Sequence, residues 1–153
     1  MKNWILTTIT LITFSQITSA QADSNRIFLA SKGTWKYPVS QGFILENNLG
    51  YNANKTVIFI SDSAATVNAV FAGVVVLVNK YDDAYMAITK YGDYFIGYSN
   101  MGNCIVKKGD KIKAGNVIGY VGKDLDDRYG VDIILSNRDG DLDASSWFSS
   151  ALL

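Results

Sequence analysis

Apolar and polar residues alternate along the chain in short segments that end at Gly, Asn or Asp. The apolar positions are mainly β-branched or aromatic, and no window keeps the spacing of an amphipathic helix. The pattern predicts nine strands, at Arg26–Ala30, Gly42–Leu45, Thr56–Ile60, Thr66–Val70, Gly73–Asn79, Tyr85–Lys90, Tyr94–Ser99, Asn116–Val121 and Val131–Ser136. A short C-terminal helix or turn is expected around Ser145–Ser150.

Short strands at this spacing predict an all-β fold, a single-domain sandwich or barrel of antiparallel strands. Neither a linker nor a shift in composition follows residue 23, so residues 23–153 are expected to form one domain. A chain of 153 residues is long enough for one hydrophobic core.

The first 22 residues have the layout of a secretory signal peptide. A weakly basic start at Met1–Asn3 precedes an uncharged run from Trp4 to Ile17, and Ala20-Gln21-Ala22 offers a small-x-small cleavage site. We expect cleavage before Asp23 and export to the periplasm or to the extracellular or cell-wall space. The alternative is an uncleaved membrane anchor, for which the run is short and rich in Thr and Ser.

Composition removes several kinds of chemistry. Fourteen basic residues balance fourteen acidic ones, so charge gives no case for nucleic acid or an anionic membrane surface as a partner. The chain has no histidine, the most common zinc ligand and proton shuttle. Its one cysteine, Cys104, excludes an intramolecular disulfide. Cys104 is expected to be a small buried hydrophobe, with an intermolecular disulfide as the alternative.

The stretch Lys107–Gly119 is the most distinctive in the sequence. Gly109-Asp110 and Gly115-Asn116 are residues that suit tight turns, and apolar residues stand between and after them. We expect a β-turn-β corner, a structural motif that biotinyl and lipoyl carriers share with peptidases. Lys90, the residue that a carrier would modify, lacks the flanking residues of a carrier hairpin.

Four segments, taken in their order along the chain, resemble the LytM domain of the lysostaphin-type metallopeptidases, over roughly residues 35–148. The third of them, the corner at Lys107–Gly119, resembles the family's V-x-x-G-D-x-V-x-x-G-x-x-I-G. The other three segments are Val67–Val75, similar to V-x-A-x-x-x-G-x-V; Tyr94–Met101, similar to the strand that ends Y-x-H-L; and Val131–Leu135, similar to L-H-F-E-I and followed by Asp139-Gly140 and Trp147.

The resemblance implies where a zinc site would be. Active members bind zinc through the His and Asp of H-x-x-x-D and the last His of H-x-H, and a further His on the Y-x-H-L strand stabilises the transition state. These positions correspond to Asn54 and Ile58, to Gly130 and Asp132, and to Asn100. A catalytic zinc needs three good protein ligands and a bound water. The resemblance therefore implies a chain that has lost its zinc site, with no cofactor and no peptidase activity.

The vacated positions, together with Tyr98, are expected to line a binding groove; ordinary strand surface is the alternative for Tyr98 and Asn100. Asp132 could instead hold a cation with Asp124, Asp126 and Asp127, although that loop lacks the glycine and glutamate of a known calcium loop. The many tyrosines suit recognition of sugars or proteins, or reflect strand propensity alone.

From the resemblance we expect an exported, non-catalytic, murein hydrolase activator-like factor that binds and regulates a peptidoglycan hydrolase such as an amidase. The alternative is a module that holds wall glycan or peptide without cutting it. Hydrolysis by another mechanism is a third hypothesis, and no Ser-Lys or paired-carboxylate arrangement in the sequence supports it.

Overall fold

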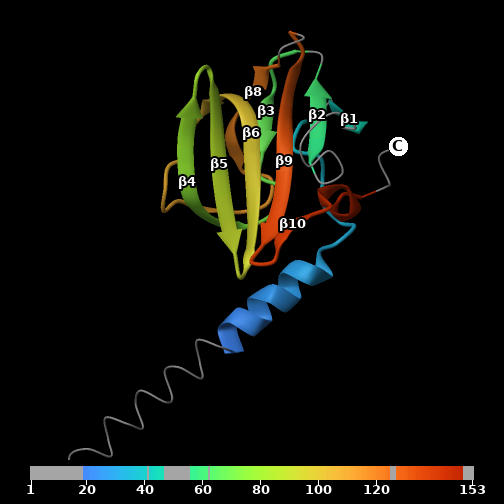
Figure 1. Ribbon diagram of the computed structural model, residues 1–153, viewed down its shortest axis with the longest axis vertical. Helices are drawn as coiled ribbons and strands as arrows, with labels where there is room; N and C mark the ends of the chain where they lie inside the picture. The colour runs from blue at the N-terminus through green and yellow to red at the C-terminus, as the bar shows by residue number, and fades with distance from the viewer. Residues whose placement is uncertain (1–18, 41, 47–55, 62, 125–126, 150–153) are drawn as a thin grey trace, which may run out of the picture.

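Ten antiparallel strands form one curled sheet in the described part of the chain (Figure 1). The computed structural model describes residues 19–40, 42–46, 56–61, 63–124 and 127–149. The elements are β1 (Gly42–Glu46), β2 (Val57–Ser61), β3 (Thr66–Asn68), β4 (Gly73–Tyr81), β5 (Ala84–Tyr91), β6 (Tyr94–Cys104), β7 (Lys111–Ile112), β8 (Val117–Lys123), β9 (Tyr129–Asn137), β10 (Gly140–Leu142) and the 3-10 helix η1 (Ala144–Trp147). The all-β fold predicted from the sequence is confirmed.

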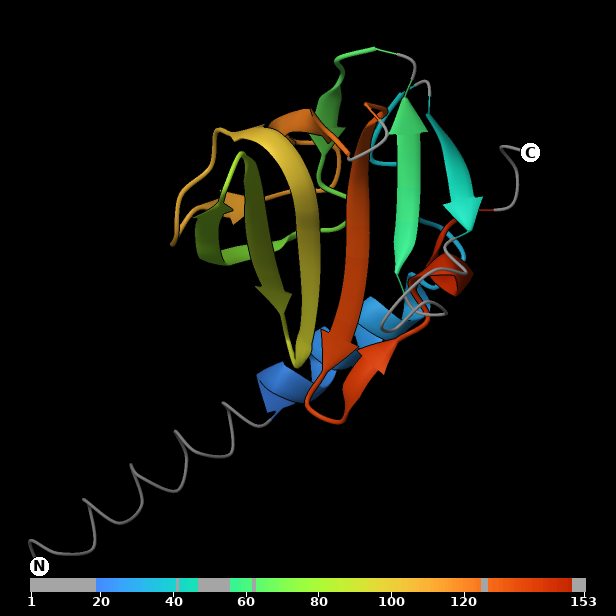
Figure 2. The same ribbon diagram turned by 45° about the horizontal axis from the view of Figure 1, so that its top comes forward.

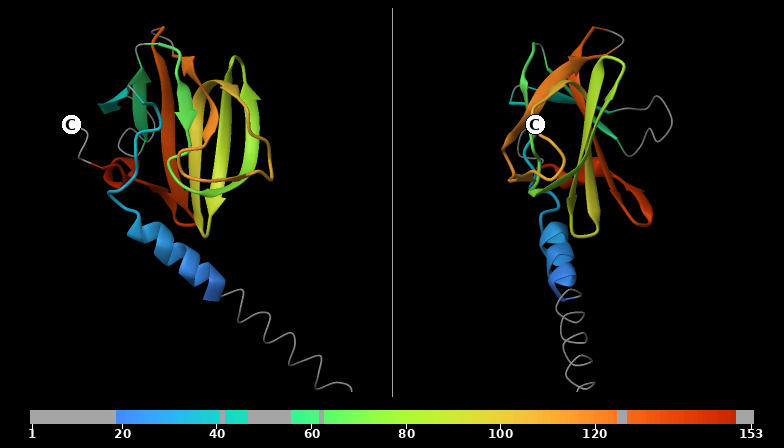
Figure 3. Two further views of the ribbon diagram at one scale, coloured as in Figure 1. Left: turned by 180° about the vertical axis from the view of Figure 1, so that it is seen from behind. Right: turned by 90° about the vertical axis from the view of Figure 1, so that its left-hand side faces the viewer.

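The strands follow the order β1-β2-β9-β8-β6-β5-β4-β7, and β9 also pairs directly with β6. Because β8 pairs with both β6 and β9, and β3 pairs with β8, the sheet folds back on itself. Figure 3 shows the consequence: in its left view, from behind, β3 and β8 lie in a layer in front of β5, β6 and β9.

The core lies between these two layers and is made of the inward side chains of both, together with buried side chains of the helix at residues 19–30 and of the connecting segments. Its largest fully buried members are Tyr98, Phe28, Phe59, Ile96, Met101, Ile118, Ile133 and Leu135. From Val131 onward the buried residues of β9 are Val131, Ile133 and Leu135, the alternation of a strand with one face in the core; Gly130 before them is buried as well. The positions between them, Asp132 and Ile134, therefore face outward.

The corner predicted at Lys107–Gly119 is present and contains two turns of the same design. Gly109 and Gly115 adopt φ of 96° and 84°, which favours glycine. In each turn the side chain that follows the glycine bonds back to a lysine N–H: Lys107 N donates to Asp110 Oδ2 at 3.0 Å, and Lys113 N donates to Asn116 Oδ1 at 2.8 Å. The turn chemistry read from the sequence thus fixes this corner.

Residues 19–30 form a helix that lies next to the β5–β6 and β9–β10 turns (Figure 2). Its Phe28 is fully buried and stacks on Tyr94, with ring centroids 4.2 Å apart. Asn25 exchanges two hydrogen bonds with Asp93 of the β5–β6 turn, at 2.7 and 2.9 Å. Asp93 also pairs with Arg138 of the β9–β10 turn at 2.8 Å.

The strand predicted at Arg26–Ala30 is wrong, because this segment is the end of that helix. Only Phe28 of its apolar residues is buried, while Ile27 and Leu29 are half exposed, so the segment has no buried strand face. The preceding residues contain good helix formers and neither Gly nor Pro, which lets the helix continue. Two further strands, β7 and β10, were not predicted and are two and three residues long.

The helix runs through the expected cleavage point before Asp23, while the anchoring side chains Asn25 and Phe28 lie after it. A chain cleaved there would keep both contacts, so the signal peptide stays a prediction. Among the described residues, no helix has the length and apolar character that crossing a bilayer requires.

Candidate functional site

Three side chains from three neighbouring strands stand in one row on the outer face of the sheet. Ile58 of β2 is directly opposite Asp132 of β9, and Asp132 is directly opposite Ser99 of β6. Directly opposed residues in antiparallel strands point to the same face, with Cβ atoms about 5 Å apart. All three are half-buried. The structure therefore brings together two positions expected from the sequence, Ile58 and Asp132, and adds Ser99.

Asn100 and Gly130 complete what we call the Asp132 site, namely Ile58, Ser99, Asn100, Gly130 and Asp132. Asn100 has a φ of 59°, and its Nδ2 donates to the carbonyl oxygen of Gly130 at 3.4 Å. This bond joins Asn100, at which the regular alternation of β6 ends, to the start of β9. Asn54, the remaining expected member, lies outside the described residues.

Tyr98 is a correction to the expected site. Its side chain is fully buried on the opposite face of β6, where its hydroxyl accepts a hydrogen bond from Val70 N at 3.0 Å. Burial raises the pKa of Tyr98 far above its ordinary value, so the phenol stays neutral. Tyr98 is a structural residue of the core and cannot touch a ligand at the Asp132 site.

Ser99 takes the place that the sequence analysis gave to Tyr98. The prediction placed Tyr98 and Asn100 in the groove because their strand resembles the family's Y-x-H-L strand; residues two apart in a regular strand would share a face. The positive φ of Asn100 and the register shift that follows Met101 break the alternation. Ser99 is next to the tyrosine that matches the motif. Its place in the site follows from the strand register, in which it lies opposite Asp132.

Asp132 is a carboxyl group held in an unfavourable environment for its charge. Burial, and then the nearby negative charge of Asp124, raise its pKa from 3.8 to about 6. Its strand neighbours across the sheet are Ile58 and Ser99, neither of which carries a positive charge. Asp132 is thus a group that gives and accepts a proton close to neutral pH.

The acidic loop before β9 is occupied by its own ion pairs. Asp124 accepts hydrogen bonds from the backbone and side chain of Arg128, both at 2.9 Å, and Asp127 pairs with Lys123 at 3.2 Å. Within the described residues no three His, Cys, Asp or Glu side chains are grouped so that they could hold a metal ion. The carboxylates of Asp124 and Asp127 are therefore already engaged with cations of the same loop, and Asp126 lies outside the described residues.

The donor set of the described residues at the Asp132 site does not fit a catalytic zinc ion. Ile58 offers no donor atom, and the whole chain lacks histidine. A Cβ built on Gly130 would lie 2.8 Å from the carbonyl oxygen of Phe59, so a side chain at that position would require the backbone to move. One carboxylate remains where zinc needs three ligands.

The other chemistry-bearing residues flagged in the sequence have structural settings. Cys104 is half-buried against the core, its thiol lies 3.6 Å from the carbonyl oxygen of Val106, and burial raises its pKa. Lys90 lies within β5 and places its amino group 5.6 Å from the ring centre of Phe95. Of the tyrosines in the described residues, Tyr81 and Tyr120 are the exposed ones, on strands β4 and β8.

Comparison with known proteins places this site in context. Residues 52–139 match the sequence profile of peptidase family M23. No curated protein sequence matches the chain significantly.

Solved structures with the same fold include a putative M23 peptidase from Pseudomonas aeruginosa (TM-score 0.63, 18% identity, 78% of this chain and 52% of that chain). Another is lysostaphin, the antimicrobial peptidase of Staphylococcus simulans (0.58, 19%, 78% and 54%). A third comes from the SpoIIQ–SpoIIIAH pore-forming complex (0.59, 19%, 74% and 85%). The chain spans about half the length of the first two.

Proposed function

Since the chain belongs to peptidase family M23, we propose that it is a non-catalytic member that binds and regulates, in the activating direction, a peptidoglycan hydrolase such as an amidase. One observation carries the proposal: an aliphatic side chain, Ile58, stands opposite Asp132 in an otherwise intact row of three strands. The fold that positions the site is kept, whereas the described residues at this place offer Asp132 as their one carboxylate, which supports a non-catalytic role.

The same row supports a role in binding. Ile58 offers apolar contact, Ser99 and Asn100 offer polar groups, and Asp132 adds a carboxyl group, all on a face that three paired strands hold rigid. Rigid strands preorganise such groups, which lowers the entropy lost on binding. A protein of the same fold occurs in the SpoIIQ–SpoIIIAH complex, so the fold is compatible with protein partners. We further propose that the chain is exported, which would place it beside its wall substrate.

The test is dye release from labelled sacculi by an amidase of the same organism, with and without the purified protein. The protein alone is expected to release no dye, with or without added zinc, and to increase release by the amidase. Asp132→Ala and Ser99→Arg are expected to abolish the increase. Asp139→Ala, an exposed carboxylate on the β9–β10 turn, is the matched control and should keep it.

Three results would refute parts of the proposal. Release by the protein alone would establish a hydrolase and end the non-catalytic assignment. An unchanged amidase rate would end the activator role; co-sedimentation with sacculi would then decide for the alternative, a module that holds wall glycan or peptide without cutting it. Loss of amidase activity on addition of the protein would identify an inhibitor.

A further inference from the structure

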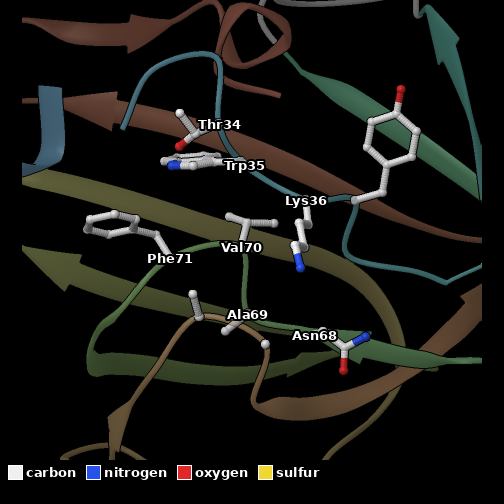
Figure 4. A pocket seen from close by; sticks show the side chains of 10 residues that line it. Thr34, Trp35, Lys36, Asn68, Ala69, Val70 and Phe71 are labelled. Carbon is white, nitrogen blue, oxygen red and sulfur yellow. The ribbon is translucent and has the colours of Figure 1, made fainter. Parts of the chain in front are cut away.

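A pocket of about 480 Å³ lies between the segment that follows the helix and the layer of β3 and β8 (Figure 4). One wall is the segment from Thr34 to Tyr37, and the other is the segment Asn68–Phe71 with the turn at Ala114 and Gly115. The volume falls in the range of small-ligand sites, about 300–1,000 Å³. None of the residues that line this pocket belongs to the Asp132 site.

The floor of the pocket is apolar. Trp35 and Val70 are buried, and the ring of Trp35 lies roughly parallel to that of Phe71 at a centroid distance of 6.0 Å. Two side-chain donors at the floor already have acceptors: Trp35 Nε1 donates to Ser31 Oγ at 2.9 Å, and Asn68 Nδ2 donates to Pro38 O at 3.3 Å. The floor therefore suits an apolar group of a ligand.

Three backbone donors of the pocket wall are satisfied within the protein. Ala69 N donates to Asn116 O at 2.8 Å, Gly115 N to Ala69 O at 2.7 Å, and Val70 N to the Tyr98 hydroxyl at 3.0 Å. A phosphate or sulfate site commonly uses several free backbone N–H groups. These consumed donors argue against a multiply charged oxyanion as the ligand.

Lys36 supplies the pocket with a positive charge. Its side chain is exposed and extends in Figure 4 from the wall of Trp35 toward Ala69 and Asn68, across the pocket. No acidic residue lines the pocket, and no ion pair is formed by Lys36 with any described residue. The exposed Lys113, next to Ala114, adds a second positive charge near the rim. Of these two lysines Lys36 alone lines the apolar slot, and its ammonium group matches a ligand with one negative charge and a small apolar body.

We propose that this Lys36 pocket, lined by Trp35, Lys36, Asn68, Val70, Phe71 and Gly115, binds the C-terminal end of a short peptide. The terminal carboxylate pairs with the Lys36 ammonium group, and a small aliphatic side chain lies on Trp35 and Val70. Charge-assisted pairs of this kind are stronger than neutral hydrogen bonds, and the pre-formed floor limits the ordering cost. The site is independent of the proposed function, because the buried Tyr98 separates the pocket from the outer face of β6.

The experiment compares N-acetyl-Ala-Ala with its C-terminal amide, titrated into the full-length protein and followed by amide and indole NMR shifts. The acid is expected to shift the Gly115 amide and the Trp35 indole N–H in a saturable way, and to bind about five- to tenfold more tightly than the amide. Lys36→Gln should remove this preference for the acid. Lys32→Gln is the matched control, since Lys32 is an exposed lysine outside the pocket.

A second variant tests the location without removing a charge. Ala114→Phe places a ring at the exposed rim of the pocket and is expected to block both peptides while the thermal midpoint is kept. The proposal is overturned if neither peptide causes saturable shifts at these two residues, if acid and amide bind equally, or if Lys36→Gln binds the acid as the native protein does.

Discussion

The buried carboxyl group of Asp132 makes the protein less stable at neutral pH than the same fold without that charge. We expect Asp132→Asn, which keeps the shape of the side chain and removes its charge, to stabilise the protein. In most folded proteins an engaged aspartate has the opposite effect, since its paired carboxylate stabilises the native state. The prediction is therefore specific to the setting of Asp132 between Ile58 and Ser99 and near Asp124.

The magnitude follows from the pKa. A rise from 3.8 in the unfolded chain to about 6 in the folded protein corresponds to about 3 kcal/mol of lost stability once both states are ionised. Below pH 4 the carboxyl group is protonated in both states and has no effect. Between about pH 4 and pH 6 the folded state holds the extra proton, so its contribution to stability falls as the pH rises. Above pH 6 to 7 the loss is complete.

Urea unfolding followed by tryptophan fluorescence, at several values from pH 3.5 to pH 8, measures the effect. The free energies of unfolding of native protein and Asp132→Asn should coincide near pH 3.5 and differ by about 3 kcal/mol at pH 7, or about 6–12 °C in thermal midpoint. Asp139→Asn, at an exposed carboxylate, is the control for a general change in net charge. A difference that is the same at every pH, or an Asp132→Asn variant less stable at pH 7, would refute the reasoning.

Three further predictions test the core, the helix and the metal chemistry. Tyr98→Phe leaves a buried backbone N–H without its acceptor and should cost about 1–3 kcal/mol in urea unfolding; an unchanged midpoint would contradict the assigned bond. Phe28→Ala should cost about 3–5 kcal/mol and release the helix, seen as faster amide exchange in residues 19–30, whereas exposed Leu29→Ala should do neither. Zinc should leave the thermal midpoint of the native protein unchanged and raise that of the triple variant Asn54→His, Ile58→Asp, Asp132→His; calorimetry with and without zinc decides.

The strands of this protein could be predicted because their local chemistry and their final packing agree. The alternation on β9 and the turns at Gly109 and Gly115 each point to one local structure, and tertiary contacts strengthen it. The helix before Thr34 could not be found in this way. Its place depends on one buried ring, Phe28, which packs against aromatic residues more than forty positions away.

Part of the candidate site could be predicted from the sequence. The rest depends on which strand positions lie opposite one another, and motifs do not give that register. The positions Ile58 and Asp132 were placed by matching motifs, and the strands bring them face to face. The match to the Y-x-H-L strand also put Tyr98 in the groove, whereas the structure buries it on the opposite face of β6, and the left-handed residue Asn100 breaks the alternation after it. The Lys36 pocket had no sequence signal, since its walls come from a connecting segment, a strand end and a turn that meet only in the folded chain.

The position of β9 near the end of the chain sets the order in which this protein can assemble during synthesis. β9 pairs with β2, β6, β8 and β10, and the partners of β2 are β1 and β9 alone within the described residues. A growing chain therefore holds β2 without its central neighbour until residue 137 has left the ribosome. Such long-range pairing slows folding and leaves unfinished strand edges exposed. Binding of the unfinished chain by a chaperone would protect those edges and keep it unfolded until synthesis is complete.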